Sequence, residues 1–208
     1  MSKFYYCIFA VVLSFFSVNS YADVKEFKEG EYYSSIEGNQ LSETKQITEF
    51  FSFYCGHCYN FRSVWDDLKI KYPNVSFNRI PVHFLGGPNG PLTQRAYATA
   101  EIMGIEDDFT NTLFNQIHSF NKTEYNQDSL GDVAGYVGAD KKQFLEVFDS
   151  FMPISKVASY NSEVDKARIK GVPTIMINHK YLILKAEKHE LHDLITYLLT
   201  KDNVPDKK

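Results

Sequence analysis

Hydrophobic residues in the first part of the chain alternate between strand-like and helix-like spacing. Residues 45–53 are rich in phenylalanine and include Ile47 and Thr48, which predicts a strand buried on both faces in the middle of a sheet. Apolar residues then recur at the spacing of a helix: Phe61, Val64, Trp65 and Leu68. Pro73 ends this helix, and residues 75–82 return to the strand pattern. These segments predict a β-α-β unit with its strand-to-helix turn near residue 55.

From residue 85 to residue 169 the pattern is helical. A turn-rich stretch at 86–91 opens this block. Apolar residues follow at helical spacing in several short groups: Tyr97, Ala100 and Ile102, then Phe109, Leu113, Phe114 and Ile117, and later Phe144, Leu145, Val147 and Phe148. Asp140, followed three residues later by Gln143, resembles a capping box before the last group. The block is therefore predicted to contain several short helices.

The strand pattern returns in the C-terminal part. A break at 171–173 precedes two short strand-like runs, 174–177 and 181–184, which flank a turn at 178–180. A final amphipathic helix follows, with four apolar residues on one face: Leu191, Leu194, Ile195 and Leu198. The sequence thus predicts an α/β domain that a helical block interrupts.

The N-terminus has the features of a signal peptide. Lys3 provides a basic start, residues 4–18 form an apolar run of 15 residues, and residues 20–22 (Ser-Tyr-Ala) form a small-x-Ala cleavage pattern. We expect export and cleavage before Asp23. An uncleaved anchor is the alternative, but the run is shorter than the roughly 20 residues that span a bilayer. Cys7 lies within the run and leaves with it.

Composition and charge exclude some functions. The chain has 208 residues, enough for one domain with an insertion, and a formal net charge of −4. Its basic residues are scattered and form no cluster, so we expect no nucleic-acid partner. Most of its 17 phenylalanines and 14 tyrosines should lie in the hydrophobic core, and some could be exposed and line a binding groove.

Once Cys7 is removed, two cysteines remain, and their spacing indicates redox chemistry. Cys55 and Cys58 form a Cys-x-x-Cys pair directly after the predicted buried strand. If the helix begins at Cys55, its unpaired N–H groups and its dipole stabilise the Cys55 thiolate. Cys55 is then the attacking and leaving sulfur, and Cys58, one turn inward, is the resolving one. His57 can donate a hydrogen bond or positive charge to Cys55, and Gly56 permits the tight turn.

A zinc half-site and an inert disulfide are the structural alternatives for this cysteine pair. A structural zinc site needs four ligands, and the sequence has no second Cys-x-x-Cys or His-x-x-x-His pair to supply the rest. An inert disulfide across so short a loop constrains the unfolded chain little. Both alternatives are weaker than redox chemistry, and we expect no metal site.

Three segments of the chain resemble the DsbA family of periplasmic thiol:disulfide oxidoreductases. They are residues 50–61 (FFSFYCGHCYNF), 82–87 (VHFLGG) and 171–181 (GVPTIMINHKY), and the similarity extends over nearly the whole chain after the signal peptide. The resemblance implies an α/β protein with a thioredoxin fold interrupted by an inserted all-helical domain. The corresponding boundaries are 1–22 for the signal peptide, 23–84 for the first part of the thioredoxin-like domain, 85–169 for the helical insertion and 170–208 for the second part.

The resemblance assigns roles to individual residues. Cys55 resembles the family's nucleophilic cysteine and Cys58 its resolving partner. Val172 and Pro173 resemble the cis-proline loop, which lies against the disulfide and binds the substrate backbone. Independently, a proline that opens a strand leaves the neighbouring backbone free to bond an extended peptide. A plain turn proline is the alternative, since most X-Pro bonds are trans.

Glu49 is an acid within an otherwise apolar strand, six residues before Cys55. Acids are seldom buried unless they are paired or functional. In the family, an acid at this place lies beneath the active site and assists proton transfer to and from the inner cysteine. Arg79 matches a basic family position that can pair with that acid. The alternative is that Glu49 faces a sheet edge and is solvated, but we favour the functional role.

The resemblance implies a periplasmic enzyme that donates its Cys55–Cys58 disulfide to reduced exported proteins. The disulfide is itself the redox group, so no other cofactor is expected. A monomer is expected, and a DsbB-type, quinone-linked membrane protein would reoxidise it. Gly56 departs from the proline that most members carry there, which leaves the strength of the oxidant open. A disulfide reductase or isomerase, and a non-catalytic thioredoxin-like binding module or chaperone, are the competing functions.

Overall fold

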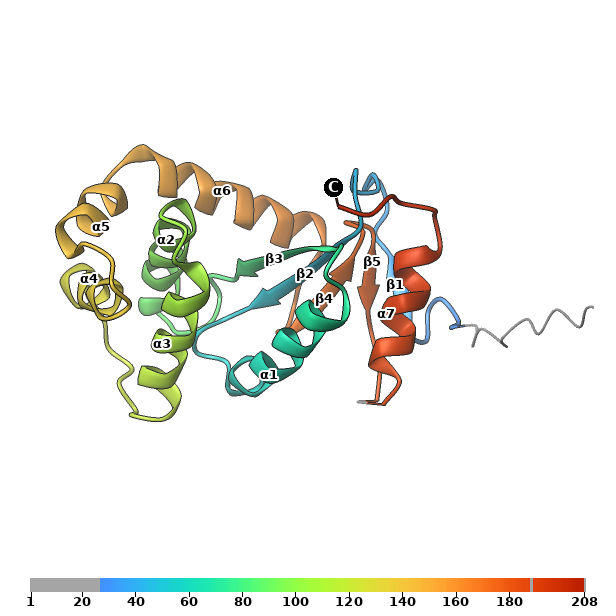
Figure 1. Cartoon of the computed structure of the whole chain (residues 1–208), viewed down its shortest axis with the longest axis horizontal. Coiled ribbons are helices and arrows are strands. Elements are labelled where there is room, and N and C mark those ends of the chain that lie inside the picture. Colours follow the sequence, from blue (N-terminus) through green and yellow to red (C-terminus); the bar gives the residue numbers. More distant parts are fainter. Residues whose placement is uncertain (1–26, 188, 208) are drawn as a thin grey trace, which may run out of the picture.

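The structure, a computed structural model, describes residues 27–187 and 189–207, so the predicted signal peptide and Cys7 lie outside the described residues. The strands are β1 (Tyr33–Ser35), β2 (Gln46–Phe51), β3 (Ser76–Pro81), β4 (Thr174–Ile177) and β5 (Tyr181–Ile183). The helices are α1 (Gly56–Lys71), α2 (Asn89–Ile102), α3 (Glu106–His118), α4 (Gln127–Tyr136), α5 (Lys141–Phe148), α6 (Phe151–Lys166) and α7 (Leu191–Thr200). This order confirms the predicted β-α-β start, helical middle and β-β-α end (Figure 1).

The strands of the described chain form one mixed sheet, in the order β1-β5-β4-β2-β3. Strand β2 pairs with β3 in parallel and with β4 antiparallel, so it lies inside the sheet. Residues 47–51 of β2 are all buried, as the phenylalanine-rich run predicts. Strand β1 was not predicted, because its three residues carry no pattern of their own and are held by pairing with β5.

Helices cover both faces of the sheet. On one face, α1 and α7 pack against the isoleucines of β2 and β4, with Trp65 and Leu68 as the buried residues from α1. On the other face, α6 runs back from the far helices to the sheet and contacts β3 (Figure 1). Strand β2 is therefore enclosed by protein above and below, which is why its polar residues must find partners within the fold.

Helices α2 to α6 gather beside one end of the sheet, and all of them lie between β3 and β4 in the sequence (Figure 1). Helix α2 is central to this group and packs against α3, α4, α5 and α6. Residues 96–100 are all buried, and the three alanines among them leave room for the surrounding helices. These helices all fall within the block predicted for residues 85–169.

The starts of α4 and α5 are set by capping side chains. Asp140 accepts the backbone N–H of Gln143 at 2.7 Å, which confirms the predicted start of α5. The reciprocal capping box occurs at α4, where Asn126 Oδ1 accepts the N–H of Ser129 and Ser129 Oγ accepts the N–H of Asn126.

Among the described helices, none combines the length and the apolar character needed to cross a membrane.

The loop between β3 and α2 packs against Tyr54, the residue before Cys55. Gly86 in this loop has a φ of +88°, and a Cβ placed there would lie 2.2 Å from Cδ2 of Tyr54. Glycine is required here because it accepts a positive φ and has no side chain to strike the ring. The predicted turn at 86–91 therefore also fixes the position of Tyr54.

We expect Gly86→Ala to lower the free energy of unfolding by about 2–5 kcal/mol. The positive φ should cost an alanine about 1–2 kcal/mol, and displacing the Tyr54 ring about 1–3 kcal/mol more. Gly87→Ala is the matched control, because Gly87 has a φ of +53° but a Cβ added to it would meet nothing within 4 Å. Urea unfolding of the reduced proteins measures both losses. Equal losses in the two variants would contradict the close contact with Tyr54.

Candidate active site

Cys55 lies at the junction where strand β2 passes into helix α1. Its backbone is extended (φ −101°, ψ 110°), and its Sγ accepts the backbone N–H of Cys58 at 3.1 Å. Cys55 is therefore the N-cap of α1, as the sequence predicts. Ser52 shapes the turn before it, because its carbonyl accepts the N–H of Cys55 at 3.1 Å and its Oγ accepts the N–H of Tyr54 at 3.2 Å.

The structure brings Val172 and Pro173 to the same sulfur. The Val172–Pro173 peptide bond is cis, and the thiol of Cys55 donates to the Val172 carbonyl oxygen at 3.4 Å. These residues are 117 positions apart in the sequence. The bond before Pro173 is thus not the trans bond of the plain-turn alternative, and the loop lies where a chain bound to Cys55 would meet it.

The two cysteines are both thiols in this structure, but their surroundings differ. Cys55 keeps 8% of its surface exposed, whereas Cys58 keeps only 1%. Burial raises the pKa of the Cys58 thiol well above its usual range, and the hydrogen bond with Cys55 and the nearby Glu49 carboxyl raise it further. Cys58 therefore resists ionisation, and Cys55 is the more exposed residue of the two.

Glu49 and Arg79 form a buried ion pair on neighbouring strands. The two residues are directly opposite each other in the β2–β3 register, and Arg79 Nε donates to Glu49 Oε2 at 2.8 Å. Their side chains are only 2% and 7% exposed, and the guanidinium carbon lies 4.9 Å from the centre of the Trp65 ring. The pairing is as the sequence analysis expected, and the alternative of a solvated Glu49 at a sheet edge is wrong.

Glu49 is readily protonated despite its ion pair with Arg79. Burial raises its pKa from 4.5 to about 7, and the charge and hydrogen bond of Arg79 counter this only in part. A carboxyl group with a pKa near 7 can both accept and release a proton at neutral pH. Glu49 also contributes to the raised pKa of Cys58, which places its carboxyl within electrostatic reach of that thiol.

His57 has a more peripheral position than Cys55 and Cys58. It lies in the first turn of α1 with its side chain exposed, and its ring makes no hydrogen bond to Cys55 within the described part of the chain. Gly56 is also exposed, and a Cβ placed there would meet nothing within 4 Å. In residues 27–187 and 189–207, no group of three His, Cys, Asp or Glu side chains is placed to hold a metal ion.

A segment of the helical block, residues 118–123, contacts the turn around Cys55, which was not predicted from the sequence. His118 Nε2 donates to the Phe53 carbonyl oxygen at 2.8 Å. The Tyr59 hydroxyl shares a hydrogen bond of 2.7 Å with Ser119 Oγ, and the Tyr54 hydroxyl donates to the Thr123 carbonyl oxygen at 3.2 Å. No local pattern signals these contacts, because the partners are about 60–70 residues apart and meet only when the block has folded.

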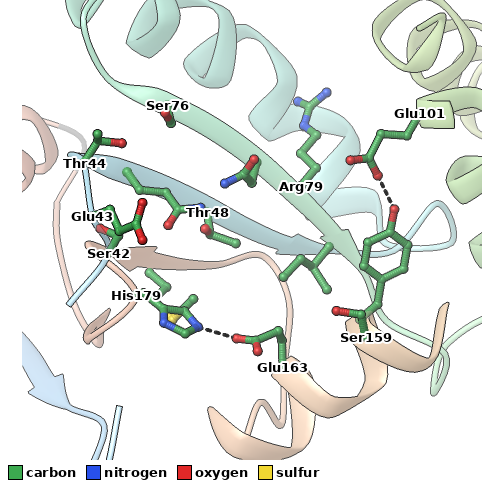
Figure 2. A pocket seen from close by; sticks show the side chains of 15 residues that line it. Ser42, Glu43, Thr44, Thr48, Ser76, Arg79, Glu101, Ser159, Glu163 and His179 are labelled. Atoms are coloured by element: carbon green, nitrogen blue, oxygen red, sulfur yellow. Dashed lines mark hydrogen bonds and ion pairs between the residues drawn. The ribbon is translucent and has the colours of Figure 1, made fainter. Parts of the chain in front are cut away.

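A polar cavity of about 550 Å³ lies elsewhere, between the sheet and α6 (Figure 2). Thr48 and Arg79 line it from the sheet, and Glu163 lines it from α6. Figure 2 shows the contact of Glu163 with His179, whose Nε2 lies 2.5 Å from Glu163 Oε2. Neither cysteine lines this cavity, nor do Val172 and Pro173, but Arg79, the partner of Glu49, does.

Proteins that set a Cys-x-x-Cys pair at the start of a helix, after a central strand and opposite a cis-proline, exchange thiols and disulfides. The fold and the site therefore define a thiol:disulfide oxidoreductase of the thioredoxin type. The model of the family described as DSBA-like thioredoxin domain matches residues 46–195. The chain belongs to this DsbA-like family, and it is a protein disulfide oxidoreductase.

Relatives and solved structures agree with this family. The thiol:disulfide interchange protein DsbA of Pectobacterium carotovorum is 29% identical over 97% of this chain and 100% of its own length. The protein of the same name from Escherichia coli K12 is 30% identical over 87% of this chain and 86% of its own.

Two solved structures give the same architecture. DsbA of Pseudomonas aeruginosa superposes with a TM-score of 0.76 at 26% identity, over 85% of this chain and 94% of its own. A Proteus mirabilis DsbA with a non-covalently bound peptide, PWATCDS, gives a TM-score of 0.73 at 28% identity, over 84% of this chain and 98% of its own. The thioredoxin fold with helices inserted between β3 and β4 is thus shared with proteins that carry the DsbA name.

The raised pKa of Glu49 predicts how stability depends on pH. Between pH 4.5 and about 7, the folded protein keeps a proton on Glu49 that the unfolded chain has released. The free energy of unfolding should therefore fall as the pH rises through this window, by roughly 3 kcal/mol for a shift of this size. Glu49→Gln, which cannot titrate, should lose this slope.

Urea unfolding of the reduced protein at several pH values measures the effect. The difference in unfolding free energy between wild type and Glu49→Gln should shrink, or change sign, from pH 4.5 to pH 7. Glu146→Gln is the control, because Glu146 has an exposed side chain and its replacement should leave the slope intact. Parallel curves for wild type and Glu49→Gln would show that Glu49 has an ordinary pKa.

Proposed function

We propose that the protein is a periplasmic oxidase that passes its Cys55–Cys58 disulfide to reduced exported proteins, through a mixed disulfide at Cys55. The observation that carries this proposal is the unequal setting of the two sulfurs. Cys55 Sγ caps α1 beside the Val172 carbonyl, and the residue keeps 8% of its surface exposed, whereas Cys58 keeps 1% and its thiol has a raised pKa. An incoming thiolate therefore has one sulfur to attack.

The reaction proceeds by two thiol–disulfide exchanges. A client thiolate attacks Cys55 Sγ, the Cys55–Cys58 bond breaks, and Cys58 leaves with the electron pair and takes up a proton. A second client thiolate then attacks the client sulfur of the mixed disulfide, and Cys55 leaves as a thiolate. The client gains a disulfide and gives up two electrons. The enzyme is left as the dithiol, with Cys55 and Cys58 both reduced.

Glu49 supplies the proton that Cys58 takes up when it leaves. Its pKa of about 7 suits a group that must both give and regain a proton near neutrality. Arg79 holds the carboxyl in place through the 2.8 Å hydrogen bond from Nε. Arg79 also lines a pocket of about 150 Å³ at the edge of the sheet, together with Glu101 and Glu106, and this pocket offers the ion pair a route to solvent.

The 172–173 loop binds the client backbone. The loop precedes β4, and its Val172 carbonyl oxygen lies 3.4 Å from Cys55 Sγ. Pro173 has no N–H and cannot donate a hydrogen bond to a neighbouring strand. The backbone beside it can therefore pair with an extended peptide. The cysteine-containing peptide bound to the Proteus mirabilis DsbA supports this type of client.

The family and the N-terminal sequence support a periplasmic location for the enzyme. Residues 1–22 act as a cleaved signal peptide, so that the mature enzyme begins at Asp23 in the periplasm. The disulfide is the only redox group that the reaction requires. A DsbB-type, quinone-linked membrane protein restores the disulfide after each turnover, and the enzyme acts as a monomer. His57 assists Cys55 from the rim of the site, where its exposed ring can move.

Trapping the mixed disulfide tests the proposal directly. Cys58→Ser leaves Cys55 without its resolving partner, so we expect covalent adducts with exported proteins to accumulate in the periplasm. Non-reducing gels after acid quenching, followed by identification of the adducts, provide the measurement. The double variant Cys55→Ser with Cys58→Ser is the control and should form none. If Cys58→Ser also forms no adduct that a reductant releases, the non-catalytic binding module becomes the better interpretation.

The redox equilibrium with glutathione tests the direction of exchange. In a glutathione buffer poised at about −200 mV, an oxidase should be at least about 90% reduced, since a potential about 30 mV more positive shifts a two-electron couple tenfold. Alkylation of free thiols and mass spectrometry give the reduced fraction. A mainly oxidised protein in the same buffer would instead favour a reductase.

The variant Gly56→Pro, measured in the same buffer, tests how the residue between the cysteines affects the redox equilibrium. A Cβ at Gly56 meets nothing within 4 Å, and the extended backbone of Cys55 is the conformation that a following proline favours. The variant should therefore fold normally, so that any change in the equilibrium reports on the residue between the cysteines.

A further inference from the structure

The 118–123 segment is bound directly to the turn that carries Cys55. Its contacts reach Phe53 and Tyr54 on one side of the cysteine and Tyr59 on the other. Tyr59 is one helical turn beyond Cys55, whose carbonyl oxygen accepts the Tyr59 N–H at 3.0 Å. The segment is therefore anchored to residues on both sides of the attacking sulfur.

The backbone of the segment is also fixed within the helical block. The N–H groups of Ser119 and Phe120 both donate to the Asn115 carbonyl oxygen, at 2.9 and 3.2 Å, and the N–H of Lys122 donates to Gln116 at 2.9 Å. Hydrogen bonds thus hold the segment both to the end of α3 and to the active-site turn. The backbone of this segment is held in place before a client arrives, so binding does not have to order it.

Phe120 is the unusual side chain of this segment. It is 76% exposed, whereas Phe53 and Phe114 in the same region are about 1% exposed. An exposed phenylalanine gains free energy when an apolar partner covers it. Single exposed apolar residues are common on protein surfaces, but this one lies on a segment that is hydrogen-bonded to the turn that carries Cys55.

We propose that Phe120 is a client-binding residue that contacts an apolar side chain within three residues of the client cysteine. The proposal rests on the oxidase function proposed above and names one feature of the client. The 172–173 loop takes the client backbone, which is common to all sequences, whereas Phe120 selects among side chains. Three residues of extended chain span about 10 Å, which sets how far from its cysteine a client can offer that side chain.

Oxidation of two matched peptides tests this role. Both peptides carry two cysteines; one has leucines at the positions flanking the first cysteine and the other has serines there. The second-order rate constant of the oxidised enzyme with each peptide is normalised to its rate constant with dithiothreitol, which reports the reactivity of the disulfide alone. In Phe120→Ser, the leucine-to-serine ratio of rate constants should fall about three- to tenfold, the range for one lost aromatic contact.

Two further variants make the test specific. Phe151→Ser removes an equally exposed phenylalanine, also 76%, at the start of α6 and should keep the wild-type ratio. Phe120→Leu restores an apolar side chain and should recover most of the ratio. A wild-type ratio in Phe120→Ser would overturn the proposal, and so would an equal loss in Phe151→Ser. An equal fall in the rates with both peptides and dithiothreitol would overturn it too, because Phe120 would then act on the disulfide itself.

The same measurements keep this proposal separate from the oxidase function. If wild type oxidised neither peptide, the oxidase function would fail regardless of Phe120. If wild type oxidised both peptides but did not prefer leucine over serine, the function would stand and the proposed role of Phe120 would fall.

Discussion

The hydrogen bond from the Cys58 N–H to the Cys55 sulfur is the interaction on which the site depends. It makes a sulfur the N-cap of α1, in a place that proteins usually give to the oxygen of Ser, Thr, Asp or Asn. A thiolate there would accept the same N–H as an anion beside the helix N-terminus, where negative charge is favoured. The bond forms because β2 ends within the sheet and Ser52 turns the chain so that α1 starts at once. The positions at which β2 ends and α1 begins thus determine the geometry of the cysteine pair.

The buried ion pair of Glu49 and Arg79 is a weak source of stability. Burying two charges costs several kcal/mol of desolvation, which their attraction only partly offsets, so apolar side chains would stabilise the sheet at least as well. Burial raises the pKa of Glu49 to about 7, and the same carboxyl acts on the pKa of the Cys58 thiol. A fully solvated acid would stay ionised at neutral pH and would have no proton to offer. Burial thus gives the fold a carboxyl group, close enough to Cys58 to affect the pKa of its thiol, that can hold a proton at neutral pH.

Much of this arrangement could be predicted from the sequence, because its signals are local. The buried strand, the helix after it and the cysteine spacing come from short patterns, and the parallel pairing of β2 with β3 then sets Glu49 opposite Arg79. The three residues of β1 carry no pattern and were missed. The contact of His118 with Phe53 was also missed, since a histidine that ends a helix has no local sign of a partner 65 residues away. Such contacts depend on how the helical block packs, and this packing cannot be predicted from a short stretch of sequence.

The helical block matters to the cysteine site in two ways. It supplies the 118–123 segment, whose hydrogen bonds hold the residues on both sides of Cys55. It also leads directly into the 172–173 loop. Helix α6 ends at Lys166, and only a short stretch of chain separates Lys166 from the cis peptide bond and β4. A movement of the block relative to the sheet would shift both neighbours of the sulfur together. The insertion is therefore part of the machinery that presents Cys55, and a minimal thioredoxin fold with the same Cys-Gly-His-Cys segment would expose that sulfur to a different set of partners.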